Sequence, residues 1–261
     1  AMERIAAACA VLAEKPPRTF FEAVQSVIIT QDLIVSESAS GSLSLGRLDQ
    51  YLFPYYTRDR ALGRLDDEEA QTLIVALWLK LGNLSRGFQN VTLGGCDKEG
   101  RCAVNQLTVF ALRASGYTHL DQPLFSFRYH PDTAPETWDE IFRLLSTGLG
   151  FPALFNDDIV LQAKASTGVA QEDLWRYGIV GCVEPSIPGD EYSNTEELRV
   201  NWAKVLEWLL LPDRCPIPAY DFPPLSGLNT FESFLRAYQD ALAFYTRLGM
   251  KATDLLDAAY G

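Results

Sequence analysis

The sequence has few basic residues and no long apolar run. Lys and Arg together number 22 against 34 Asp and Glu, which gives a net charge of -12. A chain this acidic lacks the basic footprint that nucleic acid or an anionic membrane surface requires. The best apolar candidate, residues 73–81, is well short of the roughly 20 residues needed to cross a bilayer, and it contains Lys80. These absences favour small molecules and other protein subunits as partners.

The sequence also has few cysteines and no motif of a phosphate-binding loop. The 5 cysteines are odd in number and widely scattered, which suits reduced thiols better than a disulfide framework. Reduced thiols predict a cytoplasmic protein, and the first residues lack the charged-then-apolar layout of a signal peptide. Cys96 and Cys102 flank a polar turn without two further zinc ligands nearby, so they are predicted to be hairpin neighbours only. No glycine-rich dinucleotide or phosphate loop occurs.

An apolar, β-branched stretch ends in a thiol and a carboxylate. Residues 177–185 (YGIVGCVEP) predict a short strand that runs into a turn, because glycine and proline bound the apolar run. Side chains two residues apart in an extended strand point to the same side, so Cys182 and Glu184 are expected to face one cavity. The alternative is a core cysteine beside a surface glutamate, since cysteine often packs as a small hydrophobe.

The order of the expected elements predicts an α/β protein that forms one domain. Helices and strands alternate along most of the chain, which favours a largely parallel sheet or a barrel. The helix after Asp66 is the clearest, because Asp66 and Glu69 have capping-box spacing and apolar residues follow on one helical face. The expected strands are 88–95, 123–129, 152–155 and the one that reaches Cys182, with an irregular strand or loop at 37–44. The expected helices are 2–14, 19–35, 66–81, 104–114, 135–147, one after 158, 172–177, 196–211 and a last one that begins near 231.

Two other groups of residues could carry chemistry. Residues 156–158 (NDD) would cap the following helix or bind a metal, and cap positions favour these residue types. His130 is the better of the 2 histidines for a Cys-His nucleophile pair with Cys182, which would make the protein a cysteine hydrolase. Nothing in the sequence places the His130 ring beside Cys182.

Several segments, taken together, resemble the glycyl radical enzymes, the family of pyruvate formate-lyase, glycerol and diol dehydratases and choline trimethylamine-lyase. The matching phrases stand in the family's order at 46–56 (GRLDQYLFPYY), 89–95 (QNVTLGG), 126–130 (SFRYH), 152–158 (PALFNDD) and 181–185 (GCVEP). The resemblance covers nearly the whole chain but only the central portion of a family member.

The resemblance implies a fold, a cofactor and a chemistry. The fold would be part of the family's ten-stranded α/β barrel, with the Cys182 turn in the barrel's centre. Cys182 would become a transient thiyl radical that removes a hydrogen atom from a substrate carbon, and Glu184 would accept a proton from the neighbouring hydroxyl. The radical would be stored on a glycine outside this segment and installed by a radical S-adenosylmethionine activating enzyme under anaerobic conditions. The family is commonly dimeric, so a homodimer is expected at full length.

The same resemblance indicates a branch and a set of substrate-facing positions. Pyruvate formate-lyase has two adjacent cysteines at this turn, so the single Cys182 indicates the dehydratase and lyase branch. The substrate-facing positions would be Gly41, Ser42, Phe88 and Glu196. Gly41 replaces a histidine of the glycerol dehydratases and Glu196 replaces an aspartate, which argues against glycerol as the substrate. From the residues alone, Ser42 is equally a loop hydroxyl, Phe88 a core aromatic and Glu196 a first-turn helix acid.

The family's glycine-radical phrase is missing from these residues. Family members carry an Arg-Val-x-Gly-Tyr-like phrase near the C-terminus, and residues 1–261 contain none. The chain is therefore expected to be a single central segment, without the N-terminal part and the C-terminal glycyl radical domain, and to be inactive alone. The alternatives are an inactive remnant that binds a small molecule, or an acyltransferase like pyruvate formate-lyase.

Overall fold

The chain forms two compact units, Ala1–Ser193 and Asn194–Gly261. The computed structural model describes residues 2–38, 42–84, 88–191, 199–217 and 220–260. Each unit has its own hydrophobic core, and the expectation that the chain belongs to one domain stays a prediction.

The first unit contains a parallel sheet of four strands in the order β1, β2, β3, β4. These strands are β1 (Ser42–Arg47), β2 (Phe88–Gly94), β3 (Leu124–Tyr129) and β4 (Ala153–Asn156). The α/β class and the parallel sheet are confirmed, and β1 is irregular because its register shifts between Ser44 and Gly46. The ten-stranded barrel stays a prediction, since the described strands form an open sheet.

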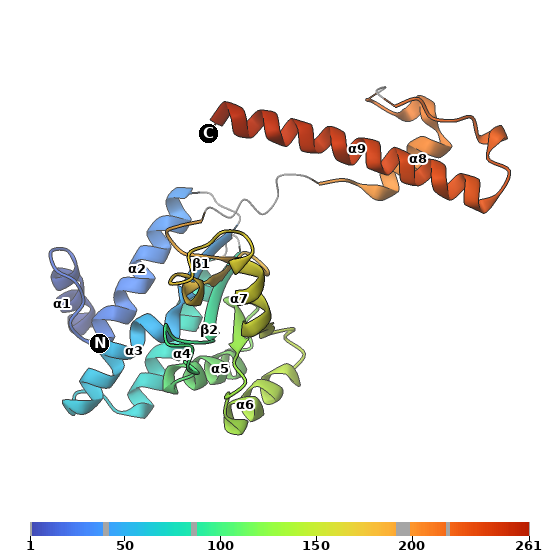
Figure 1. Cartoon of the computed structure of the whole chain (residues 1–261). Helices are drawn as coiled ribbons and strands as arrows, with labels where there is room; N and C mark the ends of the chain where they lie inside the picture. The colour runs from blue at the N-terminus through green and yellow to red at the C-terminus, as the bar shows by residue number, and fades with distance from the viewer. Residues whose placement is uncertain (1, 39–41, 85–87, 192–198, 218–219, 261) are drawn as a thin grey trace. The chain divides into compact units, whose positions relative to one another are not determined.

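Helices connect the strands and cover one face of the sheet (Figure 1). Asp66 caps α4 as predicted, because its side chain accepts a hydrogen bond from the backbone N–H of Glu69 at 2.7 Å. The helices of this unit are α1 (Met2–Leu12), α2 (Phe20–Ser38), α3 (Leu48–Ala61), α4 (Asp67–Asn83), α5 (Gln106–Thr118), α6 (Pro135–Leu145) and α7 (Asp157–Ala165).

The two faces of the sheet differ in chemistry. On β2, Val91 and Leu93 are buried in the main hydrophobic core together with residues of α3, α4 and α5. Neighbouring residues of a strand point to opposite faces, so Asn90 and Thr92 lie on the other side. Both polar side chains are also buried. Another part of the protein therefore covers the polar face.

An antiparallel hairpin lies against this polar face. A 3-10 turn, η1 (Leu174–Arg176), leads into β5 (Gly178–Val180), and the chain then reverses into β6 (Glu184–Ser186). Tyr177, Ile179 and Ile187 are fully buried and form a small hydrophobic cluster at the base of the hairpin. The hairpin is therefore packed onto the unit.

The second unit is helical, with α8 (Trp202–Leu210), α9 (Phe231–Tyr260) and the short turns η2 (Pro212–Arg214) and η3 (Leu225–Gly227). Its core includes Val205 and Tyr245. The helix predicted from residue 196 begins later, because Asn201 is the N-cap and its side chain accepts from the N–H of Lys204. Among the residues that the structure describes, no helix is long and apolar enough to cross a membrane.

Candidate active site

Cys182 lies at the tip of the β5–β6 hairpin and is exposed. The predicted strand running into a turn is confirmed. The extended geometry expected through Cys182 and Glu184 differs, because residues 181–183 form the turn and Glu184 begins the returning strand. The rule that side chains two residues apart in a strand share a side therefore does not apply to Cys182 and Glu184. The contacts around the turn show which groups lie near the thiol.

The carboxylate of Glu184 folds back onto the turn that carries Cys182. Its Oε2 accepts a hydrogen bond from the backbone N–H of Val183 at 3.0 Å. A Cβ atom added at Gly181 would lie only 2.7 Å from the same oxygen, and Gly181 has a φ of +59°. Glycine is therefore favoured there by the backbone conformation, and a larger residue would also displace the Glu184 carboxylate. The carboxylate contacts the residues on either side of Cys182.

Two of the predicted substrate-facing residues lie near this turn. Ser42 and Phe88 are register partners at the starts of β1 and β2. The Ser42 Oγ is 3.4 Å from the position that a Cβ on Gly181 would take, and Phe88 is 47% exposed. Gly41 and Glu196 lie outside the described residues. The structure thus places Ser42 beside the Cys182 turn and Phe88 next to Ser42.

Besides its pairing with β6, β5 is held by side chains of the four-stranded sheet. The Ser44 hydroxyl donates to the carbonyl of Ile179 at 2.7 Å, and Thr92 Oγ1 accepts from the Ile179 N–H at 2.8 Å. Asn90 Nδ2 donates to the carbonyl of Gly181 at 3.1 Å. These bonds satisfy backbone groups that would otherwise be buried without partners. They fix the backbone directly before Cys182.

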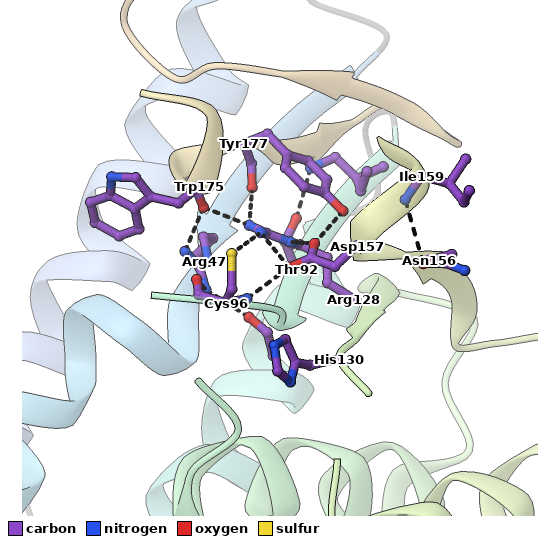
Figure 2. A network of polar contacts seen from close by, with 12 residues as sticks. Arg47, Thr92, Cys96, Arg128, His130, Asn156, Asp157, Ile159, Trp175 and Tyr177 are labelled. Atoms are coloured by element: carbon purple, nitrogen blue, oxygen red, sulfur yellow. Dashed lines mark hydrogen bonds and ion pairs between the residues drawn. The ribbon is translucent and has the colours of Figure 1, made fainter. Parts of the chain in front are cut away.

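A buried ion pair lies at the base of the hairpin (Figure 2). Arg128 Nε and Nη2 donate to the two oxygens of Asp157 at 2.7 and 3.0 Å, and both side chains are fully buried. The Tyr177 hydroxyl donates to Asp157 Oδ1 at 2.7 Å. Burial alone would raise the pKa of Asp157, but the hydrogen bonds and charge of Arg128 outweigh it and hold that pKa below its ordinary value. Asp157 is therefore ionised.

Two guanidinium groups bind the backbone that leads into β5. Arg128 Nη1 donates to the carbonyls of Tyr177 and Trp175 at 2.6 and 3.0 Å, and Arg47 Nη1 donates to Trp175 at 2.8 Å. Burial and the neighbouring Arg128 lower the pKa of Arg47 to about 10, so it remains charged at neutral pH. Gly95 makes room for this arrangement, since a Cβ there would lie 2.5 Å from Arg128 Nε.

Sequence reasoning missed this network. Asn156 caps α7 as predicted, because its side chain accepts from the N–H of Ile159 at 3.5 Å. Its neighbour Asp157 instead turns inward to Arg128, as Figure 2 shows. The available signal was the arginine within the apolar strand 124–129, because a buried guanidinium requires a carboxylate or carbonyl partners.

The other candidate groups lie away from the turn. Both ring nitrogens of His130 are engaged, Nε2 with the carbonyl of Gly100 at 3.1 Å and Nδ1 with the N–H of Asp132 at 3.1 Å. These contacts give no support to a pair with Cys182. Cys96 and Cys102 face each other across an antiparallel bridge, which confirms that they are hairpin neighbours. Within the described residues, no cluster of His, Cys, Asp and Glu could hold a metal ion.

Comparisons with known proteins agree with one another. A family model described as pyruvate formate lyase-like matches residues 1–261. A probable dehydratase of Escherichia coli (strain K12) is 31% identical over 95% of this chain and 34% of its own length. The (2S)-3-sulfopropanediol dehydratase of Klebsiella oxytoca is 30% identical over 99% of this chain and 34% of its own length. This chain thus spans about a third of these relatives.

The fold has a solved counterpart. The glycerol-bound form of the B12-independent glycerol dehydratase from Clostridium butyricum has a TM-score of 0.84 and 29% sequence identity to this chain. The match covers 98% of this chain and 34% of that one.

Proposed function

This chain belongs to the pyruvate formate lyase-like family of glycyl radical enzymes, and we propose that it carries the radical cysteine of a dehydratase or lyase. The reaction would be the loss of water or another leaving group from a small hydroxylated substrate. The observation that supports this proposal is the hairpin: it presents an exposed Cys182 and holds the Glu184 carboxylate against the same turn. The dehydratases among the matched proteins favour this branch of the family.

The proposed steps use the two side chains in sequence. A glycyl radical outside these residues, installed by a radical S-adenosylmethionine activating enzyme, would supply the unpaired electron. Cys182 as a thiyl radical takes a hydrogen atom from a substrate carbon, so an S–H bond forms and a C–H bond breaks. Glu184 accepts the proton of the hydroxyl on that carbon, and the leaving group departs from the adjacent carbon with its bonding electrons. The product radical then takes the hydrogen atom back from Cys182.

The substrate would lie between the Cys182 turn and the starts of β1 and β2. Ser42 and Phe88 are register partners at this end of the strands, and Phe88 exposes its aromatic ring. We also propose Gly41 and Glu196 as substrate-facing positions, because the family resemblance places them there. A hydroxyl, a carboxylate and a small apolar surface suit a short polyol or a similar hydroxylated molecule.

The role of Glu184 is tested by Glu184→Gln in the full-length protein, activated anaerobically. The variant should keep the organic radical signal in electron spin resonance and lose at least about 100-fold in product formation, as expected when a general base is removed. Substrates for the assay are short 1,2-diols and their sulfonated analogues.

The matched control is Glu172→Gln, because Glu172 is an exposed glutamate of the same unit. It should retain both the radical signal and product formation. Full product formation by Glu184→Gln would contradict the assigned role of the carboxylate.

A further inference from the structure

Cys96 and Cys102 occupy directly opposed positions in a small hairpin. The flanking residues make the backbone bonds: Ala103 N–H donates to Gly95 at 2.8 Å, and Asp97 N–H donates to Arg101 at 2.9 Å. The two cysteines are therefore a non-hydrogen-bonded pair, in which the Cα atoms are about 4.5 Å apart and the side chains share a face. This separation lies within the range of about 4.4–6.8 Å that disulfides span.

The turn between them holds this register. The Asp97 side chain accepts from the backbone N–H groups of Glu99 and Arg101 at 3.0 and 2.9 Å. The Gly100 N–H donates to the carbonyl of Asp97 at 3.0 Å. Because the loop is short and bonded internally, little chain entropy remains to be lost when the two sulfur atoms meet.

The two thiols differ in access. Cys96 is 4% exposed, whereas Cys102 is half-buried, and both are free. Burial, and then the charge of Asp157, raises the pKa of the Cys96 thiol to about 11, so this sulfur is protonated at neutral pH. Cys102 is therefore the thiol that an oxidant in solution reaches first.

Cys96 also belongs to the network that supports the Cys182 hairpin (Figure 2). Its N–H donates to Asp157 Oδ2 at 2.7 Å, and its sulfur lies 3.9 Å from Arg128 Nη2. The carbonyl of Cys96 accepts from Arg47 Nη2 at 2.9 Å. A covalent change at this sulfur therefore reaches the groups that bind Trp175 and Tyr177.

We propose that Cys96 and Cys102 are a modification site, a thiol pair that peroxide converts to a reversible disulfide. Peroxide first oxidises the Cys102 thiol to a sulfenic acid and leaves as water. The Cys96 thiol then loses its proton and its sulfur attacks the sulfenic sulfur, so that an S–S bond forms, the S–O bond breaks, and the hydroxide leaves with that proton as a second water. Two thiols lose two electrons in total and the O–O bond gains them. The bond turns the Cys96 sulfur toward Cys102 and away from Arg128.

The test is to treat the reduced full chain with hydrogen peroxide, then to alkylate free thiols in denaturant and digest with trypsin. Cleavage after Arg86, Lys98, Arg101 and Arg113 yields peptides 87–98 and 102–113. Mass spectrometry should find these two peptides linked, and a reductant should separate them. Alkylation of both thiols in the treated chain would overturn the proposal, as would equal linkage among all the cysteines.

Two variants sharpen this measurement. Cys102→Ser should abolish the linked peptides, and Cys9→Ser, at an exposed cysteine of α1, should leave their yield unchanged. Peroxide added to the chain in guanidinium should give a lower yield of the linked peptides in the same time, because only the closeness of the two thiols in the sequence then brings them together. A yield in guanidinium equal to that of the folded chain would overturn the structural argument.

Coupling to the hairpin has its own readout. Amide hydrogen exchange across residues 177–186 should be faster in the oxidised chain than in the reduced one, because the Arg128 contacts change. Equal exchange in the two forms would overturn the coupling. Neither the peptide-linkage measurement nor the exchange measurement depends on the proposed radical activity. Failure of the disulfide proposal can therefore be told apart from failure of the proposed function.

Discussion

The buried carboxylate of Asp157 is the residue on which most of the hairpin's support converges. It binds Arg128, the Tyr177 hydroxyl and the Cys96 N–H, and all three partners are buried. Arg128 in turn binds two backbone carbonyls just before β5. Since removing the carboxylate leaves Arg128 buried without its charge partner, this is where a single substitution should cost most.

Asp157→Asn should lower the free energy of unfolding of the first unit by about 3–5 kcal/mol, the usual cost of breaking a buried ion pair. The variant keeps the shape of the side chain and leaves Arg128 charged and unpaired. Urea unfolding, followed by hydrogen exchange of peptides from this unit, measures the loss. Asp158→Asn is the matched control, because Asp158 is exposed in the same helical turn, and an equal loss in both variants would contradict the account.

The original protein and Asp157→Asn also test how the stability of the first unit depends on pH. The folded pKa of Asp157 lies below its ordinary value, so its stabilisation is fully present above that ordinary value, about 3.9. It is lost as the pH falls through the folded pKa. The difference in stability between the original protein and Asp157→Asn should therefore be constant near neutral pH and shrink in acid.

The β5–β6 hairpin is also held by polar side chains of β1 and β2. Ser44 and Thr92 bind the two backbone groups of Ile179, and Asn90 binds the carbonyl of Gly181. These residues come from β1 and β2, and two of them stand in the phrase 89–95 that resembles the family. The polar residues of that phrase thus have a structural use, which is to position the hairpin that carries Cys182.

Thr92→Val tests this use of the sheet. The substitution keeps the shape and removes the acceptor for the Ile179 N–H, so a buried donor loses its partner at a cost of about 1–3 kcal/mol. Amide exchange at Ile179 should become faster while the helices α4 and α5 keep their protection. Thr72→Val, at an exposed threonine of α4, is the control and should change neither. Slow exchange at Ile179 in Thr92→Val would contradict the account.

The sequence predicted the regular elements well and the hairpin only in part. The α4 helix and strand β2 follow from apolar spacing and from the residues that bound them, Asp66 and Gly95. The strand that runs into a turn at Cys182 was predicted, but the returning strand was not, because the two strands of the hairpin have only 3 residues each and are too short to show alternation. The ion pair of Asp157 was hidden for another reason: its partner is 29 residues away in the sequence.

On the scale of the molecule, the two hydrophobic cores define the organisation. Val205 and Tyr245 pack with residues of their own unit, and Val91 and Leu93 pack within the first. No change in composition marks the boundary between Ser193 and Asn194, so the sequence predicted one domain. All the described residues of the candidate site, including Ser42, Phe88 and Glu184, belong to the first unit.

Hydrogen-atom transfer at Cys182 is the central claim, and one comparison tests it most directly. The full-length protein and its variants Cys182→Ala and Cys9→Ala are activated anaerobically, and the radical signal and product are measured in the same samples. We predict that all three show the organic radical, and that only Cys182→Ala forms no product. Product formation by activated Cys182→Ala at the rate of Cys9→Ala would contradict the account.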